Sequence, residues 1–394
     1  METKKNILMV HNFYQIGGGE HTVFENEKRL LRTHGHFVAE YQRSNEELLH
    51  SGLKKLLLPF TAVFSLRTYR EVKTCIRRDK IDLVHCQNTF PLISPAVYYA
   101  AWSCHVPVVQ TIHNYRFLCP NGLLFRKGKI CEDCVCRGLG QALKQGCYRG
   151  SRLETGVVVL MLKIHRLLGT YGRLNYIFLT DFMRKKFRPL LGDKQSGIFL
   201  KPNFTEPVTA EPGERDWNRF LFASRLEESK GILFLLQVWK QVKDRDLVIY
   251  GTGPLEETVQ KAAAENPRIH WKGFCPRQEI FQDLERSAAL IFPSLWYEGF
   301  PMVITEAMAL GRPVLCSDLG NGADLIKQNR AGLCYRPDEA ADFLEKLELL
   351  TDPEQNGRLG ARGRAAWEEK YAPEENYRIL KQIYDEVCRE DGKG

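Results

Sequence analysis

Short apolar runs alternate with segments of helical periodicity along most of the 394-residue chain. Runs at residues 5–13, 81–88 and 106–114 are typical of strands, and the segments between them have the spacing of helices. Strands that alternate with helices favour parallel sheets covered by helices. The pattern therefore predicts an α/β protein with doubly wound sheets, whose ligands lie at the carboxyl ends of the strands.

The length of the chain, about twice that of a usual domain, indicates two domains. Residues 1–205 hold 31 lysines and arginines against 15 acidic residues, whereas residues 206–394 hold 25 against 33. This change from +16 to −8 coincides with a proline-rich stretch without periodicity at residues 201–214, which is typical of a linker.

We therefore predict a first domain at residues 1–203, with a cysteine-rich insertion at 119–149. A second domain is expected at 204–372, and a C-terminal helix at 373–394 is expected to cross back to the first. In the second domain, strands and helices alternate up to residues 313–318, which we expect to complete the sheet.

The segment EGFPMVITE places two carboxylates, Glu298 and Glu306, eight residues apart. A strand is expected to end before Glu298, and Glu306 lies one turn inside the next helix. Acidic residues are common in first turns, but this does not explain Glu298. A helix start with free N–H groups binds phosphate, and flanking carboxylates can accept from sugar and ribose hydroxyls. The expected phosphate-binding stretch is Gly299, Phe300, Pro301, Met302 and Val303.

Two cations, Arg225 and Lys230, lie in SRLEESKG, at the end of one expected strand and the start of the next helix. Together they can neutralise a diphosphate leaving group. Lysine is unfavourable at a helix start because of the helix dipole, which favours a functional role for Lys230 over a structural one.

The first half offers two further motifs, each weak by itself. The turn GGGE at Gly17–Glu20 has the shape of a phosphate turn without a complete dinucleotide-binding fingerprint. His113, in TIHNYR, follows a strand and should therefore point towards the ligand side of the sheet.

Taken together, these motifs resemble those of retaining glycosyltransferase family 4, which includes bacterial polysaccharide-type enzymes and carries a Glu-x7-Glu motif. The resemblance implies a GT-B fold: two Rossmann-like, doubly wound domains with an interdomain cleft that binds the donor. It implies that Glu298 contacts the transferred sugar and that Glu306 binds the ribose. It assigns the donor diphosphate to Arg225 and Lys230.

The same resemblance implies that Gly18 and Gly19 approach the donor phosphate and that His113 bonds a sugar hydroxyl. The family often has Asp after this His, whereas this chain has Asn114. The implied activity is hexosyltransferase-type transfer from a nucleotide-diphosphate sugar to a hydroxyl of a glycan or lipid-linked acceptor. The implied mechanism is retention without a protein nucleophile, in which the leaving diphosphate takes the acceptor proton. The sequence has no Asp-x-Asp motif at a strand end, so we expect no cofactor for catalysis.

The insertion contains a cysteine cluster with the spacing of a structural zinc knuckle. Its candidate ligands are Cys119, Cys131, Cys134 and Cys147. Reduced thiols in a long loop are the alternative explanation.

The basic first half suits an anionic partner, although a solvated basic face explains it equally well. The stretch Glu46–Arg78 mixes leucines and phenylalanines with seven cations, which is typical of an interfacial helix or of a helix packed on the sheet. The start of the chain is not typical of a signal peptide, and Gly156–Leu162 is too short to span a bilayer. We therefore expect a cytoplasmic protein that can bind peripherally to the anionic inner membrane face.

Two other classes of function compete with this hypothesis. A sugar-nucleotide epimerase would share the architecture but lack an acceptor site. A zinc-stapled nucleic-acid-binding protein would use the basic half, but the chain has no nucleic-acid-binding motif and Glu298 and Glu306 would have no role. We expect no nucleic acid partner.

Overall fold

The computed structural model describes residues 4–14, 19–48, 52–192, 196–208, 210–211 and 213–391, which divide into two compact units. The first unit comprises Met1–Leu123, Glu132–Asn203 and Asn376–Gly394, and the second comprises Leu124–Cys131 and Phe204–Glu375. The division thus falls between Asn203 and Phe204, beside the change in charge. Leu124–Cys131, which we placed in the first domain, belongs instead to the second unit.

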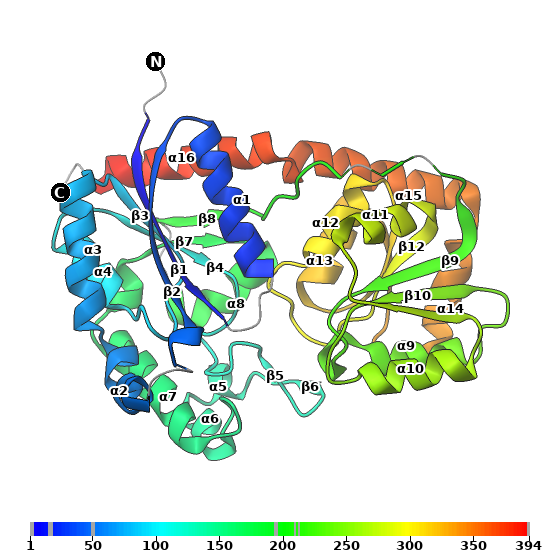
Figure 1. Ribbon diagram of the computed structural model, residues 1–394, viewed down its shortest axis with the longest axis horizontal. Helices are drawn as coiled ribbons and strands as arrows, with labels where there is room; N and C mark the ends of the chain where they lie inside the picture. The colour runs from blue at the N-terminus through cyan, green and yellow to red at the C-terminus, as the bar shows by residue number, and fades with distance from the viewer. Residues whose placement is uncertain are drawn as a thin grey trace. The chain divides into compact units, whose positions relative to one another are not determined.

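The first unit is built on a six-stranded parallel sheet in the order β2-β1-β3-β4-β7-β8 (Figure 1). Its central strands are almost entirely buried, which explains their continuous apolar sequence. The strands are β1 (Asn6–Phe13), β2 (Phe37–Ser44), β3 (Leu83–Asn88), β4 (Val108–Ile112), β7 (Asn175–Phe178) and β8 (Ile198–Leu200).

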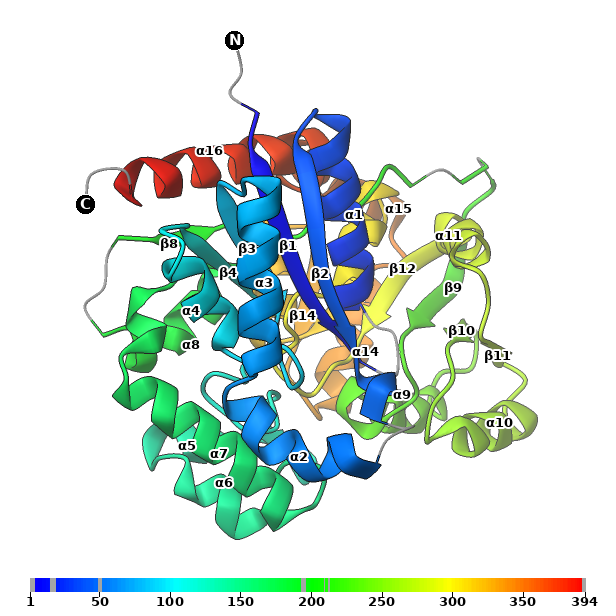
Figure 2. The same ribbon diagram turned by 60° about the vertical axis from the view of Figure 1, so that its left-hand side comes forward.

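Helices connect these strands and cover the sheet (Figures 1 and 2). Helix α16 joins this unit from Asn376 onward, where Tyr377 bonds His36 at 3.0 Å. The principal helices are α1 (Gly19–Thr33), α2 (Gly52–Val63), α3 (Leu66–Asp79), α4 (Ala96–Trp102), α6 (Gly140–Gln145), α7 (Arg152–Leu167), α8 (Asp181–Leu191) and α16 (Pro373–Asp391).

Two features of the first unit differ from the sequence prediction. Strand β2 was not predicted, because FVAEYQRS is a polar edge strand that pairs only with β1. The helical stretch predicted at Glu46–Arg78 is a short 3-10 turn followed by two helices. Ser65 ends the run by capping α3, with its side chain accepting from the Thr68 N–H.

The second unit holds a six-stranded parallel sheet in the order β11-β10-β9-β12-β13-β14. Its strands are β9 (Asp216–Ala223), β10 (Asp246–Tyr250), β11 (Ile269–Gly273), β12 (Ser287–Phe292), β13 (Val314–Ser317) and β14 (Gly332–Tyr335). Its helices are α9 (Ile232–Trp239), α10 (Glu256–Glu265), α11 (Arg277–Arg286), α12 (Met302–Ala309), α13 (Gly320–Asn329), α14 (Ala340–Leu349) and α15 (Pro353–Ala366).

The prediction that residues 313–318 complete this sheet was wrong, because α13 and β14 follow. Strand β14 has only four residues and begins with Gly332. A Cβ on Gly332 would lie 2.0 Å from the Val314 carbonyl oxygen, so only glycine allows this close pairing with β13.

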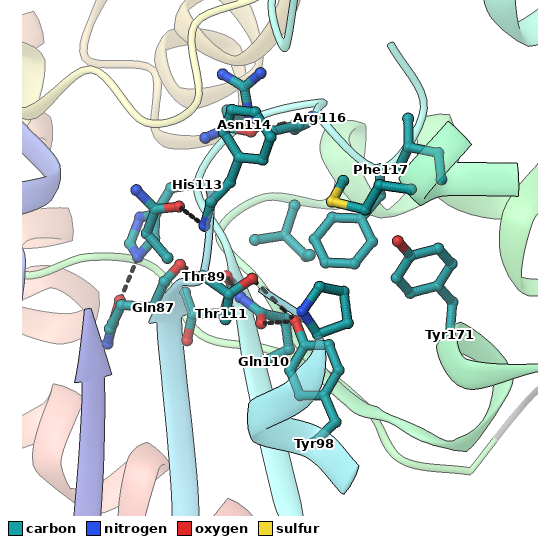
Figure 3. Close-up of a pocket in the computed structure, with 16 residues that line it drawn as sticks. Gln87, Thr89, Tyr98, Gln110, Thr111, His113, Asn114, Arg116, Phe117 and Tyr171 are labelled. Atoms are coloured by element: carbon teal, nitrogen blue, oxygen red, sulfur yellow. Dashed lines mark hydrogen bonds between the residues drawn. The ribbon is translucent and has the colours of Figure 1, made fainter. Parts of the chain in front are cut away.

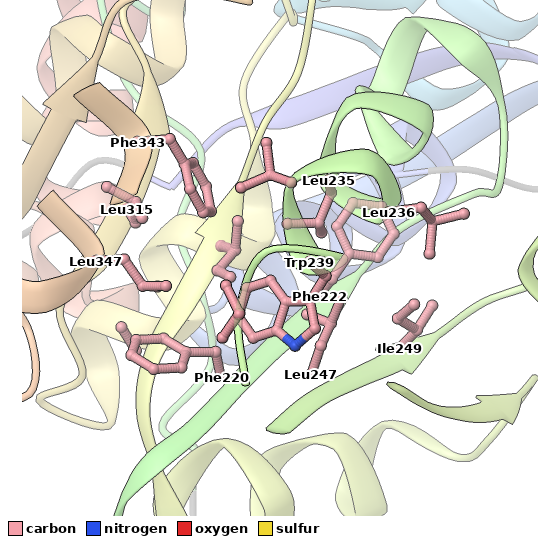
Figure 4. Packing of buried hydrophobic residues seen from close by; sticks show 14 of the residues in the cluster. Phe220, Phe222, Leu235, Leu236, Trp239, Leu247, Ile249, Leu315, Phe343 and Leu347 are labelled. Atoms are coloured by element: carbon pink, nitrogen blue, oxygen red, sulfur yellow. The ribbon is translucent and has the colours of Figure 1, made fainter. Parts of the chain in front are cut away.

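A dense aromatic core fixes the elements that carry the second unit's motifs. Trp239 of α9 is fully buried against Phe220 of β9, and its indole N–H donates to the Arg245 carbonyl at 3.1 Å (Figure 4). Phe343 of α14 lies in the same cluster. Because β9 and α9 share this core, the loop between them, which holds Arg225 and Lys230, has fixed ends.

Candidate functional site

The second unit's motifs gather at the point where its strand order reverses. Strands β9 and β12 are neighbours, and the chain leaves them in opposite directions across the sheet. Open sheets of this kind bind ligands at such a point, beyond the carboxyl ends of the strands. Arg225 follows β9, and Glu298 follows β12, so the topology brings the two motifs to one edge of the sheet.

Glu298 is the centre of a hydrogen-bonded cluster at this edge. Its Oε1 accepts from the Lys230 ammonium at 2.6 Å, from the Ser294 hydroxyl at 2.9 Å and from the Trp296 indole N–H at 2.9 Å. The Lys230 and Glu298 side chains are only 17% and 12% exposed. The structure therefore brings together two residues that the sequence predicted in separate motifs.

A glycine permits the close approach of the two loops. Gly231 has φ +74°, and a Cβ there would lie 1.9 Å from the Pro293 carbonyl oxygen. The Leu295 N–H donates to the Ser229 carbonyl at 2.8 Å across the same contact. Contrary to the prediction, Lys230 does not open a helix: it ends the 3-10 turn Glu228–Lys230, and α9 begins at Ile232.

The turn GTGP at Gly251–Pro254, which follows the neighbouring strand β10, supports Arg225. Gly251 has φ +128°, and a Cβ there would lie 1.9 Å from the Ser224 carbonyl oxygen. The Leu226 N–H donates to the Thr252 carbonyl at 2.9 Å. The Arg225 side chain is 47% exposed, and its Nε lies 3.6 Å from Glu227. Arg225 thus lies in a loop with backbone contacts to the neighbouring turn and has a half-exposed guanidinium.

Glu306 lies inside α12 and is buried, where it forms an ion pair with Arg277. The helix starts at Met302, and Pro301, its N-cap, makes no side-chain capping bond. The Asn321 amide donates to the carbonyls of Glu298 and Gly299 and so holds the turn before the helix. The turn and the start of α12 therefore link Glu298 to Glu306. This segment includes the predicted phosphate-binding stretch Gly299, Phe300, Pro301, Met302 and Val303. Arg277 was not predicted, and its sequence surroundings carry no signal for this contact.

In the first unit, His113 lies at the end of β4 and bonds Gln87 on the neighbouring β3 (Figure 3). The Gln87 carbonyl oxygen faces His113 Nε2, and the Gln87 amide donates to the buried Glu27 carboxylate. Because Gln87 accepts from His113, the proton is on Nε2 and Nδ1 is left as an acceptor. Burial lowers the pKa of His113 to about 3, so the ring is neutral.

A buried polar network extends from this pair into the unit. Glu27 Oε1 pairs with Lys201 at 2.8 Å, and both side chains are almost fully buried. Lys201 also donates to Asn376 of α16 at 2.9 Å, while His85 bonds Tyr384 of α16 and Thr111, each at 2.7 Å. The sequence signal for Glu27 is its position on the apolar stripe of α1, between Phe24 and Leu30.

Glu20 is a candidate residue that the sequence prediction missed, although it belongs to the quoted GGGE turn. Its carboxylate accepts from the Asn114 amide at 3.0 Å, and burial raises its pKa. An acid from α1 thus lies beside Asn114, the residue that follows His113. Gly19 begins α1, and Gly18 lies outside the described residues.

A pocket opens beside His113 between β3, β4 and α7 (Figure 3). Its aromatic and polar walls include Gln87, Tyr98, Gln110, His113, Arg116 and Tyr171. The Arg116 guanidinium stacks on Phe90, with its carbon 4.5 Å from the ring centre. Aromatic faces and hydrogen-bonding groups of these kinds line ligand pockets in general.

Zinc binding by the predicted cysteine set stays a prediction. Among the residues that the structure describes, no group of three or more His, Cys, Asp or Glu side chains is arranged to hold a metal ion. A hydrogen bond with the Cys119 thiol, together with burial, raises the pKa of Cys134, and Cys147 adds to this shift. Cys131, however, belongs to the segment Leu124–Cys131 of the second unit, whereas Cys119, Cys134 and Cys147 belong to the first.

Comparison with known proteins gives two family matches on this chain. Residues 16–130 match the model described as Glycosyltransferase Family 4, and residues 218–352 match Glycosyl transferases group 1. The second match includes Arg225, Lys230, Glu298 and Glu306, and the first includes His113. Neither match describes a nucleic-acid-binding protein or an epimerase.

Two of the curated relatives are named as transferases of a specific sugar. The D-rhamnosyltransferase WbpZ of Pseudomonas aeruginosa is 31% identical over 39% of this chain and 41% of its own length. The lipopolysaccharide 1,6-galactosyltransferase of Escherichia coli K12 is 31% identical over 38% of this chain and 44% of its own. This chain therefore spans about half the length, or less, of these relatives.

The solved structures extend the likeness to the whole fold. The glycosyltransferase of Rickettsia africae has a TM-score of 0.69 at 17% identity, with 98% of this chain and 100% of that chain covered. HepE of Anabaena, solved with UDP and glucose, has a TM-score of 0.65 at 15% identity, with 97% and 100% covered. With two parallel-sheet, Rossmann-like units and both domain matches, this chain has the GT-B fold and carries the domains of the family 4 and group 1 glycosyltransferases.

Proposed function

We propose that this protein transfers a sugar, with retention, from a nucleoside diphosphate to a hydroxyl of a glycan or lipid-linked acceptor. The observation that carries the proposal is the Lys230–Glu298 pair at the edge of the second unit's sheet. Where a cation lies beside a carboxylate, the cation can bind a diphosphate and the carboxylate can accept from a sugar hydroxyl next to it. HepE, which has the same fold, binds UDP and glucose.

In this proposal the second unit binds the donor. Lys230 and Arg225 neutralise the diphosphate, and the N–H groups at the start of α12 bind it through the helix dipole. Glu298 accepts from a hydroxyl of the transferred sugar, and Glu306 accepts from the ribose after Arg277 moves aside. Gly18 and Gly19 approach the donor phosphate from the first unit, as the family resemblance implies.

The proposed reaction breaks the bond between the anomeric carbon and the diphosphate oxygen. A bond to the acceptor oxygen forms on the same face of the sugar, and the acceptor proton passes to the departing diphosphate. Neither Glu298 nor Glu306 attacks the anomeric carbon. The protein's contribution is to stabilise the negative charge and to orient the reactants.

The pocket beside His113 is the proposed acceptor region. Its neutral imidazole offers Nδ1 as an acceptor for a sugar hydroxyl, and the relatives act on lipopolysaccharide and related glycans by name. A lipid-linked acceptor would bring the protein to the anionic inner face of the membrane. No helix within the described residues is long and apolar enough to cross a membrane.

A donor panel tests the proposal. Radiolabelled UDP-, GDP- and dTDP-sugars are incubated with the protein and membrane extract, and label in a glycan or lipid product is expected for one donor. Arg225→Ala should lower this transfer about a hundredfold, as loss of a charge contact in the transition state does; Arg268→Ala, which changes an equally exposed arginine of the same unit, is the matched control. Label found only in an epimerised nucleotide sugar, or a product of inverted anomeric configuration by NMR, would contradict the proposal.

A further inference from the structure

Helix α7 is apolar on its inner and its outer face. Its inner face packs Val158, Met161 and Leu162 into the unit. Its outer face presents three leucines that recur every seven residues: Leu153, 86% exposed, Leu160, 52% exposed, and Leu167, 89% exposed. Surface helices ordinarily present polar residues outward, so this outer face is anomalous for a helix that only packs on a sheet.

The elements that contact α7 also expose apolar side chains. Phe60 of α2 is 75% exposed, and α2 is tied to α7 by a 2.9 Å bond between His165 Nε2 and the Val63 carbonyl. Leu143 of α6 is 41% exposed, and its side chain lies beside Gly156 of α7. Figure 2 shows α2, α6 and α7 gathered at one end of the unit. We call Phe60, Leu143, Leu153, Leu160, Leu167 and Leu168 the α7 surface.

The polar residues around the α7 surface are mainly cationic. Lys144, Arg152 and Lys163 are exposed. The acidic neighbour Glu154 lies 4.0 Å from Arg149, which offsets its charge. Residues 1–205 as a whole carry a formal charge of +16. The α7 surface thus combines leucines with a positive border, and an apolar patch of this kind marks an interaction site.

We propose that the α7 surface docks onto an anionic lipid bilayer, with α7 lying in the plane of the headgroups. Leucines of such a helix enter the boundary between headgroups and acyl chains, while lysines and arginines meet the anionic headgroups. The inference rests on the proposed function, because a lipid-linked acceptor requires the enzyme to work at a membrane. The inference goes beyond the proposed function because it assigns the membrane contact to α7. The sequence indicated only the stretch Glu46–Arg78.

A second copy of this chain is a less suitable occupant. Pairing two α7 helices would bring two cationic borders together, and like charges at an interface oppose association. The exposed residues also extend over α2 and α6, whereas a seam between two helices would need only the α7 stripe. An anionic lipid bilayer fits both the cationic border and the spread of the exposed apolar residues over α2, α6 and α7.

The test is sedimentation with vesicles of phosphatidylcholine alone or with phosphatidylglycerol. We expect the protein to bind the anionic vesicles and to bind less as salt rises. The triple variant L153Q/L160Q/L167Q should bind at least about tenfold more weakly, and R152E/K163E should also lose binding. L349Q and K240E/K243E, which change exposed residues of the second unit, should bind as the unaltered protein does.

Fold and donor binding are checked separately in every variant by the melting temperature and by its shift with UDP. Unaltered binding by the triple variant, or equal binding to both kinds of vesicle, would overturn the proposal. A dimer in solution that becomes a monomer in the triple variant, without vesicle binding, would assign the surface to a second copy. Vesicle binding as expected with no sugar transfer would leave the docking intact and refute the proposed function.

Discussion

The ammonium of Lys230 lies 2.6 Å from Oε1 of Glu298, although the two residues are 68 positions apart in the sequence. The same oxygen accepts from Ser294 and Trp296, and the Lys230 ammonium lies 5.0 Å from the centre of the Trp296 ring. These contacts fix the lysine before any ligand binds. A charge placed in advance stabilises a leaving group without reorganisation during the reaction.

Lys230→Ala should therefore lower the rate of sugar transfer about a hundredfold or more. Glu298→Gln should also lower it, because the amide no longer fixes the lysine by charge. Rates are measured with saturating donor and acceptor, and Lys240→Ala, an exposed lysine ten positions along the chain, is the control. Near-normal transfer by Lys230→Ala would show that Lys230 does not stabilise the diphosphate.

The sequence predicted the elements that are long, apolar and periodic, and the two motifs of the second unit. The reversal of strand order between β9 and β12 then explains why Arg225 and Glu298 lie at one edge. Strands β2 and β14 escaped prediction because β2 is polar and β14 has only four residues and begins with glycine, so neither has the apolar pattern of a buried strand. The partnerships of Gln87 with His113 and of Arg277 with Glu306 depend on side chains brought together only by the fold.

The buried histidines predict a loss of stability in mild acid. Burial lowers the pKa of His11 and His113 to about 3 and that of His85 to about 4. Below pH 6.5 the unfolded chain therefore binds protons that the folded protein does not, so the free energy of unfolding falls as the pH falls towards 4. Each histidine with a pKa near 3 contributes a loss of ~2 kcal/mol at pH 5. Urea denaturation between pH 7 and pH 5 measures this loss.

His113→Asn supplies the control for that measurement, because asparagine does not titrate. The pH dependence of its unfolding free energy should be shallower than that of the unaltered protein. An unchanged slope would show that His113 titrates normally in the folded state, and would contradict its assignment as a neutral acceptor.

The buried Glu27–Lys201 pair predicts a large loss of stability when one partner is removed. Burial raises the pKa of the Glu27 carboxyl, but the charge and hydrogen bond of Lys201, together with the nearby His85 and His113, outweigh burial and lower it. Lys201→Met leaves a buried carboxylate unpaired and should reduce the free energy of unfolding by about 3–5 kcal/mol. The double variant Lys201→Met/Glu27→Gln should recover part of this loss, and the exposed pair variant Lys261→Met/Glu265→Gln should show almost none. Equal destabilisation of the single and double variants would mean that packing, not charge, holds this region.

The Arg277–Glu306 ion pair predicts a link between nucleotide binding and stability in the second unit. Glu306 is 5% exposed, so its carboxylate needs a partner, which in this structure is the half-exposed Arg277. Arg277→Met removes that partner and should reduce the free energy of unfolding by about 1–3 kcal/mol, less than for a fully buried pair because water screens the exposed guanidinium.

If ribose hydroxyls take the place of Arg277, UDP should raise the melting temperature of Arg277→Met by more than it raises that of the unaltered protein. UDP should give little shift in Glu306→Gln, and Arg219→Met, which breaks a pair with Asp283 elsewhere in the unit, should show the ordinary UDP shift. Equal UDP shifts in all four proteins would show that Glu306 does not contact the nucleotide. Its ion pair with Arg277 would then have only a structural role.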